Sequence, residues 1–346
     1  MRASRLFTTA TAVAALSILA ACGSTGEADV DATAEPTSAA QEGVFPVTIP
    51  HAFGETTVDA QPVRVATVAW SNHEVPLALG IVPVGMAAAT WGDDDDNGVL
   101  PWVEDALAEL GAELPVLFDE TDGIDFEGVA NTQPDLILAT YSGLTEEDYA
   151  TLSSIAPTIA YPEVAWGTSH QDMITISSAA LGMAEEGEAL VADLDAQVAE
   201  ALAANPALDG AKVLFSYIDP SDFSQIGFYT SHDTRPGFLL DAGLPMPAVV
   251  EEETAGTDAF YVTVSAEEAD RFDDVDLFVT YGDASSDIVA QLQADPLLST
   301  IPAIAEGRVA VLENSTPLAA SANPSPLSIG WGVQDYLALL AAPLAD

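Results

Sequence analysis

Short apolar segments alternate along most of the chain with segments whose apolar residues recur every three or four positions. Residues 63–69 and 81–86 are the first apolar segments, and both are rich in β-branched residues, as in strands buried on both faces of a sheet. The alternation continues to residue 161, with strands expected at 115–118, 135–140 and 158–161 and helices at 102–110, 126–131 and from 145. Strands that alternate with helices predict a parallel sheet with helices on both faces.

The pattern changes between residues 168 and 205, where apolar residues such as Met173 and Ile176 recur at helical spacing with no strand between them. Gly182 and Gly187 are expected to break this stretch, and its longer part is a candidate rigid connector. Alternation then resumes, with strands expected at 212–217, 261–264, 275–280 and 309–312 and helices near 238, from 266 and at 327–340. The predicted organisation is two α/β lobes and a connecting helix: 44–167, 206–346 and 168–205.

Residues 1–21 have the pattern of a signal peptide. Arg2 and Arg5 precede an uncharged apolar stretch of about 16 residues, too short for a membrane span, which needs roughly 20. The stretch ends in Leu-Ala-Ala-Cys, which resembles the lipobox of bacterial lipoproteins, so Cys22 is expected to become the lipidated N-terminus. Residues 22–43 are rich in Ser, Thr, Ala and Glu and predict a flexible linker. We therefore expect a protein tethered by lipid to the outer face of the cytoplasmic membrane.

Acidic residues outnumber basic ones by 55 to 7, which gives a formal net charge of -48. Nucleic acid is therefore a poor partner, and so is an anionic lipid surface. Disorder is not implied, because 49% of the residues are hydrophobic. One lysine, Lys212, among so many carboxylates suggests a surface adapted to high salt, where screening relieves the repulsion. Cys22 is the only cysteine, so no internal disulfide is expected.

Six segments carry a resemblance to a known family, in order from about Phe45 to the end of the chain: 50–58, 62–65, 77–85, 133–138, 155–158 and 323–329. They are similar to segments of the iron-siderophore-binding lipoproteins of ABC importers, the class that binds ferrichrome, enterobactin or vitamin B12. The resemblance implies two Rossmann-like lobes joined by a single long helix, which is the helical-backbone periplasmic-binding-protein fold, with a shallow ligand cleft. We expect a monomer whose ligand is a ferric siderophore.

The same resemblance implies docking on the transmembrane subunits of an ABC importer through one exposed glutamate of each lobe. The matching positions are Glu127 and Glu267, each expected in the first turn of a helix. Acidic residues also favour helix N-termini through the helix dipole, so these positions have a purely structural explanation as well.

Loops at the carboxyl ends of parallel strands line the ligand site in lobes of this kind. The candidate ligand-binding residues are aromatic and polar residues that we assign to the cleft: Trp70, His73, Trp91, Tyr141, Trp166, Tyr229, Arg235 and Trp331. The iron of a ferric siderophore is already fully coordinated, so its receptor needs flat apolar walls and a few orienting donors rather than metal ligands. Core packing is the alternative explanation for each aromatic residue. Four arginines and one lysine remain beyond the signal peptide, which disfavours anionic complexes and favours a hydroxamate.

Residues 93–104 match the calcium-loop pattern of EF-hands, but a strand end precedes them and Pro101 occupies a ligand position. An acidic surface lipoprotein that binds calcium or a partner protein is therefore one alternative. The same fold with haem or cobalamin as its cargo is another, with His73 as a candidate contact. The four histidines are scattered, and we find no nucleophile motif or phosphate loop, so we predict no catalytic residues, no metal site and no cofactor.

Overall fold

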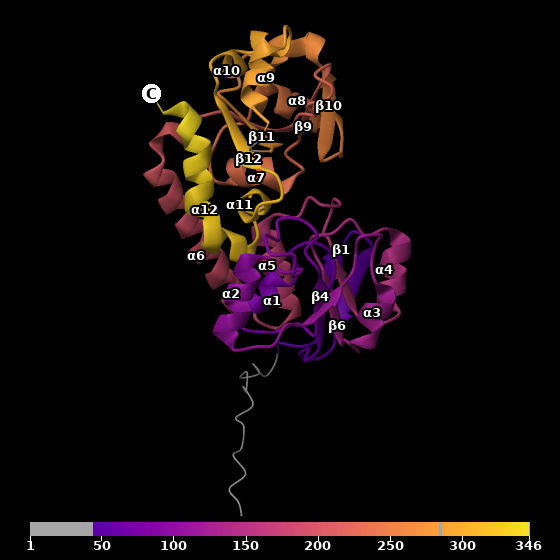
Figure 1. Cartoon of the computed structure of the whole chain (residues 1–346). Helices are drawn as coiled ribbons and strands as arrows, with labels where there is room; N and C mark the ends of the chain where they lie inside the picture. Colours follow the sequence, from indigo (N-terminus) through magenta and orange to yellow (C-terminus); the bar gives the residue numbers. More distant parts are fainter. Residues whose placement is uncertain (1–43, 284–285, 346) are drawn as a thin grey trace, which may run out of the picture. The chain divides into compact units, whose positions relative to one another are not determined.

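The computed structural model describes residues 44–283 and 286–345 (Figure 1). The predicted signal peptide, the whole of the predicted linker and the lipidation site at Cys22 lie outside the described residues. Two five-stranded sheets and one two-stranded sheet organise the described part. No helix in these ranges is long and apolar enough to cross a membrane.

The first lobe is built on a parallel sheet with the strand order β5-β4-β3-β6-β7. Its strands are β3 (Val65–Thr67), β4 (Gly85–Ala87), β5 (Val116–Phe118), β6 (Leu136–Ala139) and β7 (Thr158–Ala160). The helices between them are α1 (Glu74–Ala78), α2 (Pro101–Leu110), α3 (Phe126–Asn131) and α4 (Glu146–Ser153). Every residue of β6 is buried, as in a sheet covered on both faces. An antiparallel hairpin, which the sequence pattern does not predict, precedes this sheet: β1 (Val47–His51) and β2 (Gly54–Val58).

The second lobe is built on a mixed sheet with the strand order β10-β9-β8-β11-β12. Its strands are β8 (Val213–Tyr217), β9 (Gln225–Tyr229), β10 (Tyr261–Ser265), β11 (Leu277–Gly282) and β12 (Val309–Glu313). Strand β9 pairs antiparallel with both β8 and β10, so the prediction of a purely parallel sheet is wrong here. The physical reason is that residues 218–224 are too few for the crossover that a parallel neighbour would need.

Short helices complete the second lobe. They are α7 (Thr234–Asp241), α8 (Ala248–Gly256), α9 (Ile288–Ala294), α10 (Pro302–Ala305) and α11 (Pro317–Ser321). Four 3-10 segments accompany them: η1 (Pro206–Leu208), η2 (Ala266–Phe272), η3 (Leu298–Thr300) and η4 (Ala342–Leu344).

The connecting stretch consists of two helices, α5 (His170–Ala180) and α6 (Ala184–Ala204). They are separated at Gly182, whose φ is 74°. Gly187, which we expected to break the stretch as well, lies inside α6, where a Cβ would come within 2.0 Å of Ser178 Oγ. A glycine there lets α5 and α6 approach closely. Helix α5 packs on β1 and α1 of the first lobe, and the 21-residue α6 is the single long helix, so the predicted fold class is confirmed.

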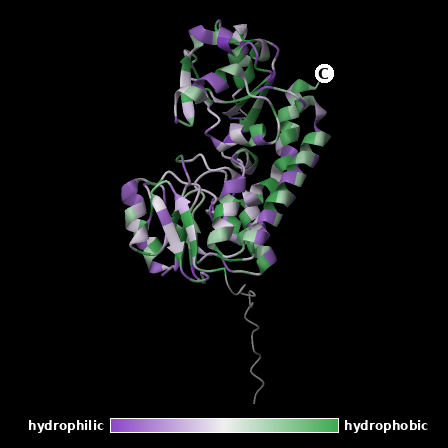
Figure 2. Cartoon of the chain, turned by 180° about the vertical axis from the view of Figure 1, so that it is seen from behind, coloured by the Kyte–Doolittle hydropathy of each residue, from purple (hydrophilic) through white to green (hydrophobic). Residues whose placement is uncertain are grey.

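Helix α12 (Pro326–Ala341) runs along α6 and also packs on α1 and α2 of the first lobe. It begins with a capping box between Ser325 and Ser328 and with a proline at its first position, two signals that define a helix start. The helix ends beside the C label in Figure 2, where it is coloured mostly as hydrophobic. Its apolar residues bury one face of the helix against other elements, while Gln334 and Asp335 lie on its exposed face.

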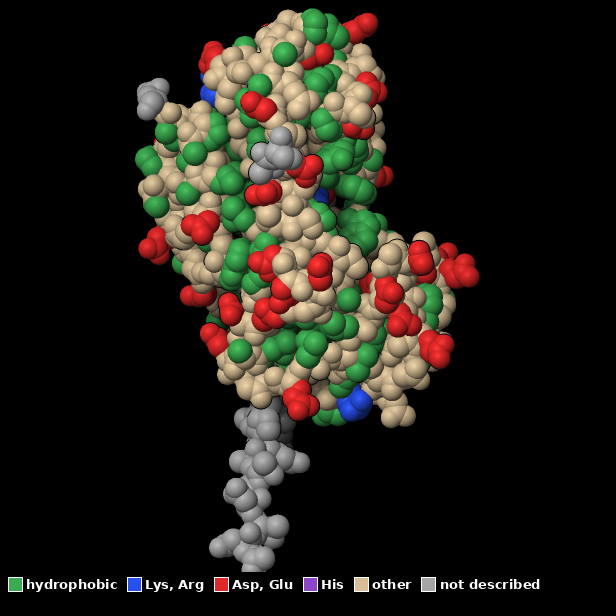
Figure 3. Space-filling view, in the orientation of Figure 1, with side chains coloured by type: hydrophobic (Ala, Val, Ile, Leu, Met, Phe, Trp, Pro, Cys, Tyr) green, Lys and Arg blue, Asp and Glu red, His purple; other side chains and the backbone are tan. Residues whose placement is uncertain are grey.

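Acidic side chains are spread over the face seen in Figure 3, and basic ones are few. Four of the five basic residues in the described ranges pair with acids: Lys212 with Asp274, Arg235 with Asp233, Arg271 with Glu253 and Arg308 with Glu306. Arg64 donates instead to backbone carbonyl oxygens of Thr132 and Gln133. Most surface carboxylates thus lack a cationic partner within these ranges, and salt is expected to stabilise the fold by screening their repulsion.

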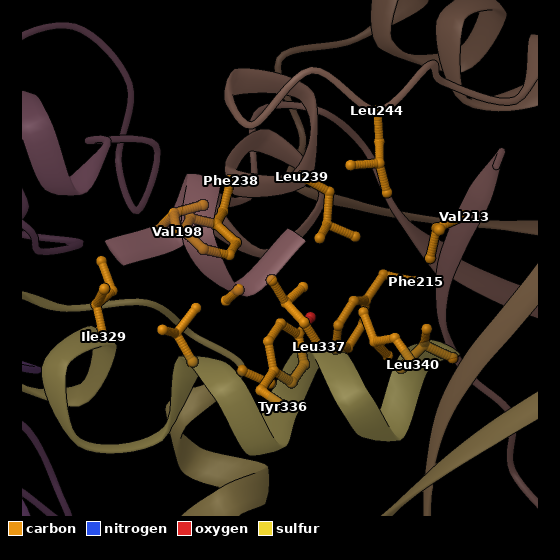
Figure 4. Packing of buried hydrophobic residues seen from close by; sticks show 14 of the residues in the cluster. Val198, Val213, Phe215, Phe238, Leu239, Leu244, Ile329, Tyr336, Leu337 and Leu340 are labelled. Atoms are coloured by element: carbon orange, nitrogen blue, oxygen red, sulfur yellow. The ribbon is translucent and has the colours of Figure 1, made fainter. Parts of the chain in front are cut away.

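The largest buried cluster fixes α12 against the second lobe. Phe215 of β8, Phe238 of α7, and Leu337 and Leu340 of α12 belong to it and lie close together in Figure 4. Phe215 is 1% exposed, and both leucines are 0% exposed. Burial of one such side chain contributes about 1.5–3 kcal/mol, so these contacts stabilise α12 against the second lobe, beside its packing on α6, α1 and α2.

Candidate ligand-binding site

A cavity of about 390 Å³ lies at the carboxyl ends of the strands of the first sheet. Residues from several strand-end loops line it, among them Trp70, His73, Glu120 and Trp166. Parallel strands end at the same edge of a sheet, which explains why residues so far apart in the sequence meet here. Three of the eight predicted ligand residues, Trp70, His73 and Trp166, therefore line one cavity.

The loop after β3 holds Trp70 in an uncommon backbone conformation. Ala69, just before it, has a φ of 61°, in the left-handed region that residues other than glycine rarely adopt. Asn72 secures the loop, because its Nδ2 donates to the carbonyl oxygens of Val68 and Tyr141, both at 2.8 Å. Trp70 is thus presented to the cavity on a backbone that hydrogen bonds hold in place.

Trp166 also lines the cavity and stands against a glycine. Its φ is 61°, and its backbone N–H donates to the carbonyl oxygen of Ser142 at 2.9 Å. A Cβ at Gly143 would lie 2.1 Å from Trp166 Nε1, so glycine is what leaves room for the indole ring. The ring of Tyr141 meets the indole edge-on, with centroids 5.4 Å apart. This wall of the cavity is therefore fixed by its immediate neighbours.

Two titratable side chains of the cavity are largely withdrawn from water. Burial lowers the pKa of His73 to about 4, so its imidazole is neutral at physiological pH. Burial raises the pKa of Glu120 to about 7, opposed by the hydrogen bond that Glu120 Oε2 accepts from the N–H of Ala69 at 2.8 Å. Among the described residues that line this cavity, none is Lys or Arg. The cavity therefore offers acceptors rather than positive charge.

The guanidinium of Arg235 lies among three side chains of the second lobe. Its Nη1 donates to Asp233 Oδ2 at 2.8 Å, and its Nε donates to the hydroxyl of Tyr281 at 3.1 Å. The guanidinium carbon lies 4.4 Å from the centre of the Tyr229 ring, a cation–π distance. Burial raises the pKa of Tyr281 to about 12, so this hydroxyl stays neutral. The Arg235 side chain is 19% exposed, so part of it remains open to a ligand.

Trp91 and Tyr141 connect the two lobes. The Trp91 ring, from the loop after β4, meets the Tyr281 ring of β11 edge-on, with centroids 5.5 Å apart. The Tyr141 hydroxyl accepts from Asn323 Nδ2 at 3.0 Å, and Asn323 Oδ1 accepts from Thr234 Oγ1 at 2.5 Å. Tyr141 is only 4% exposed, so it serves the contact between lobes and offers little surface to a ligand.

Trp331 lies apart from the other candidates. It is 40% exposed in the middle of α12, and its ring packs on Trp102 of α2 with centroids 5.2 Å apart. It is not among the described residues that line the cavity. Because α12 is a packing helix and not a strand-end loop, we leave Trp331 out of the proposed binding residues.

Glu120 is the cavity residue that the sequence prediction misses. It follows β5 just as Trp70 follows β3, so the strand-end rule applies to both. The prediction favours aromatic residues in these loops, and one glutamate among 55 acidic residues does not stand out in the sequence.

Residues 93–104 lack the flanking helix of an EF-hand, because strand β4 precedes them and α2 begins within them at Pro101. Asp93 accepts from the N–H of Gly98, and Glu104 Oε1 accepts from Asn97 Nδ2 at 2.6 Å. In the described ranges, no three His, Cys, Asp or Glu side chains are grouped so as to hold a metal ion.

The two candidate docking residues are exposed. Glu127 lies in the first turn of α3, whose N-cap Asp125 accepts from the N–H of Gly128 at 2.8 Å. Glu267 lies in the first turn of η2, where its own N–H donates to the N-cap Ser265. Side-chain caps thus define both turns that carry these acids.

Two α/β lobes, a helical connector and a cavity at the strand ends define a solute-binding protein. Residues 65–316 match the family model described as periplasmic binding protein, and the chain belongs to this family. The family membership confirms the resemblance that the sequence segments indicated.

The chain is similar to binding proteins of known structure. The chain is 47% identical to PiaA of Streptococcus pneumoniae TIGR4, solved in complex with ferrichrome, with a TM-score of 0.81 over 86% of this chain and 98% of that chain. It is 27% identical to a periplasmic solute binding protein from Mycobacterium smegmatis str. MC2 155, with a TM-score of 0.68 over 86% of this chain and 99% of that chain.

A curated relative from Bacillus subtilis (strain 168) carries the name "Probable siderophore-binding lipoprotein YfiY". The match is 28% identical over 195 residues, or 56% of this chain, and spans only about half, 55%, of the relative's length. These relatives are binding proteins and not enzymes, in agreement with the prediction that this chain is not an enzyme.

Proposed function

We propose that this chain is an extracytoplasmic lipoprotein that captures a ferric hydroxamate siderophore and delivers it to an ABC importer. The observation that carries the proposal is the combination of an aromatic-lined cavity in the first lobe with a partly exposed arginine side chain in the second lobe, Arg235. A receptor for an iron already enclosed by its chelator needs these features. The ferrichrome that PiaA binds, a hydroxamate complex, supports the same class of ligand.

The charge of the chain supports a neutral or cationic complex over an anionic one. A net charge of -48 repels the catecholate and citrate complexes of iron, which are anions. Arg235 is already paired with Asp233, so it contributes a directed hydrogen-bond donor more than free positive charge. Hydroxamate oxygens around the iron are acceptors of the kind that a guanidinium orients.

Quenching of tryptophan fluorescence tests the ligand. The protein is prepared without its signal peptide and with Cys22→Ser, in high salt, and is titrated with ferric hydroxamates, ferric catecholates, ferric citrate, haem and cobalamin. Saturable quenching by hydroxamates, weaker for the iron-free chelators, is expected because Trp70, Trp91 and Trp166 lie at or near the site. Quenching only by haem or cobalamin would show that one of these is the ligand and that a ferric hydroxamate is not. A melting temperature raised only by calcium would favour the calcium-binding alternative.

We propose delivery through Glu127 and Glu267, which would meet arginines on the importer. Uptake of radioactive iron by cells tests this step with Glu127→Lys and Glu267→Lys. Each variant is expected to lose uptake while its siderophore affinity stays unchanged. Glu146→Lys is the matched control, since Glu146 is also exposed in the first turn of a helix, α4. Unchanged uptake in both docking variants would rule out this mode of delivery.

We propose that Cys22 carries the lipid that holds the protein on the outer face of the cytoplasmic membrane. The support is the lipobox-like Leu-Ala-Ala-Cys sequence after an apolar stretch. In cells, Cys22→Ser is expected to abolish incorporation of labelled fatty acid and to shift the protein out of the lipid-anchored fraction. Labelling that persists in this variant would refute the anchor site.

A further inference from the structure

Glu120 brings a partly unsatisfied carboxylate to the cavity of the first lobe. One oxygen, Oε2, accepts the hydrogen bond from the N–H of Ala69 at 2.8 Å. The other, Oε1, is buried and has no hydrogen-bond partner among the described residues. A buried carboxylate oxygen without a donor is costly, so a donor group of a ligand would stabilise it.

The rest of the cavity has the same character. Nδ1 of His73 is also buried without a partner in the described residues, and its imidazole is neutral at physiological pH. Asp148 adds a second carboxylate to the lining. No Lys or Arg among the described residues lines the cavity to balance these acids. A ligand that enters here meets the carboxylate oxygens of Glu120 and Asp148 and a negative potential, and what complements them is a donor with positive charge.

The volume of the cavity fits a part of a ligand. Ligand pockets usually measure about 300–1,000 Å³, and this one, at about 390 Å³, lies near the lower end. Trp70 and Trp166 supply apolar walls for the methylene groups of a side arm, while Arg235 lies in the second lobe, where it is tied to Asp233 and Tyr281. The two lobes therefore offer different chemistry, a donor in one and acceptors in the other.

We infer that Glu120 receives a cationic donor group of the ligand, so that the chain selects ferric hydroxamates bearing a protonated amine over neutral ones. This inference rests on the proposed function and names the subclass of siderophore that the site prefers. The amine donates to Glu120 Oε1, and its charge is balanced by a carboxylate that the protein holds away from water. Charge-assisted hydrogen bonds of this kind are the strong ones in partly buried sites.

The rival explanation is that Glu120 serves only the backbone. Its hydrogen bond to Ala69 N–H helps to hold a residue with a φ of 61° and therefore the loop that carries Trp70. That role would change affinity for all siderophores equally. The role inferred here changes the ratio of the affinities for a cationic and a neutral ligand. A purely structural role leaves this ratio unchanged.

The test compares two chelates with the same iron centre: ferrioxamine B, which carries a pendant ammonium, and its N-acetylated derivative, which is neutral. Dissociation constants are measured by fluorescence quenching with the wild type, Glu120→Gln and Asp119→Asn. Asp119 is the matched control, because it is the exposed neighbour and is not among the described residues that line the cavity. The wild type and Asp119→Asn are expected to prefer the cationic chelate by about tenfold, and Glu120→Gln by no more than about twofold.

The pH profile gives a second readout. Because burial raises the pKa of Glu120 to about 7, the wild-type preference for the cation is expected to grow between about pH 6 and pH 8. The other titratable groups near Glu120 are Asp125, Asp148 and His73, which all remain in Glu120→Gln, whose preference is expected to stay flat.

Equal affinities for the two chelates in the wild type would overturn the inference, and so would an unchanged preference in Glu120→Gln, while both results would leave the proposed function standing. Quenching by neither chelate would overturn the inference, and the absence of quenching by ferrichrome as well would overturn the proposed function with it.

Discussion

A buried glutamate joins the C-terminal helix to the first lobe, and its replacement by glutamine is expected to change how stability depends on pH. Glu74 of α1 is 0% exposed. Its Oε1 accepts from Trp102 Nε1 of α2 at 2.8 Å, and its Oε2 accepts from the N–H of Leu327 in the first turn of α12 at 3.0 Å. Burial raises the pKa of Glu74 from 4.5 to about 7, opposed by hydrogen bonds that include these two.

The raised pKa of Glu74 determines whether its contribution to folding stability grows or falls as pH rises. Between its ordinary value of 4.5 and about 7, the folded chain holds a proton on Glu74 that the unfolded chain has lost. Stability from this group is therefore fully present at low pH and is lost as pH rises through about 7. With about 1.4 kcal/mol for each unit of pKa shift, the loss amounts to about 2.5 kcal/mol between about pH 5 and pH 8.

Urea unfolding at the two pH values measures this effect as a difference between the wild type and Glu74→Gln. Glutamine keeps the shape of the side chain but cannot ionise, so the destabilisation caused by Glu74→Gln is expected to be about 2.5 kcal/mol smaller at about pH 8 than at about pH 5. Glu109→Gln, an exposed change on α2, is the control and is expected to stay within about 0.5 kcal/mol at both values. If Glu74→Gln lowers the free energy of unfolding by the same amount at both pH values, Glu74 is ionised over this whole pH range and the reasoning fails.

Three further outcomes are expected from local packing and charge. Gly143→Ala pushes a methyl group into the Trp166 ring, 2.1 Å from Nε1, and is expected to weaken hydroxamate binding about tenfold by fluorescence titration, whereas Gly256→Ala, where a Cβ meets nothing within 4 Å, changes nothing. Leu337→Ala empties a 0% exposed position and is expected to cost about 2–5 kcal/mol in urea unfolding, against a small effect of Leu240→Ala at a 44% exposed position. Raising salt from about 0.1 M to about 1 M is expected to raise the urea midpoint, because the Debye length falls from about 10 Å to about 3 Å, and a lower midpoint would refute the role of charge repulsion.

The elements that the sequence predicts well are those with local signals. Helix 126–131 is found at its predicted bounds because Asp125 caps it, and the break near Gly182 coincides with a positive φ. The predicted break at Gly187 is wrong because this glycine leaves room for Ser178 of the neighbouring helix. The spacing of apolar residues along the chain gives no information about such a contact. Strand β9 escapes prediction because it is antiparallel and follows β8 directly, inside a region where strand–helix alternation sets the expectation.

The candidate site is predicted in part for a similar reason. Trp70, His73 and Trp166 meet because strand-end loops converge, a rule that follows from sheet topology. Trp331 lies on helix α12 and not in a strand-end loop, so the rule does not apply to it. Its ring packs on Trp102, and such a contact between helices depends on the tertiary fold. The raised pKa values of Glu74 and Glu120 could not be predicted from sequence at all, since they arise from burial that the tertiary fold creates.

Iron anomalous diffraction from crystals grown with a ferric hydroxamate would test the central claim most directly. The account predicts a single strong iron peak at the carboxyl ends of the two sheets, between the walls formed by Trp166 and the guanidinium of Arg235, with no protein atom bound to the iron. A peak bound directly by carboxylates, such as those of Asp93 and Glu104, or no peak at the strand ends, would contradict it.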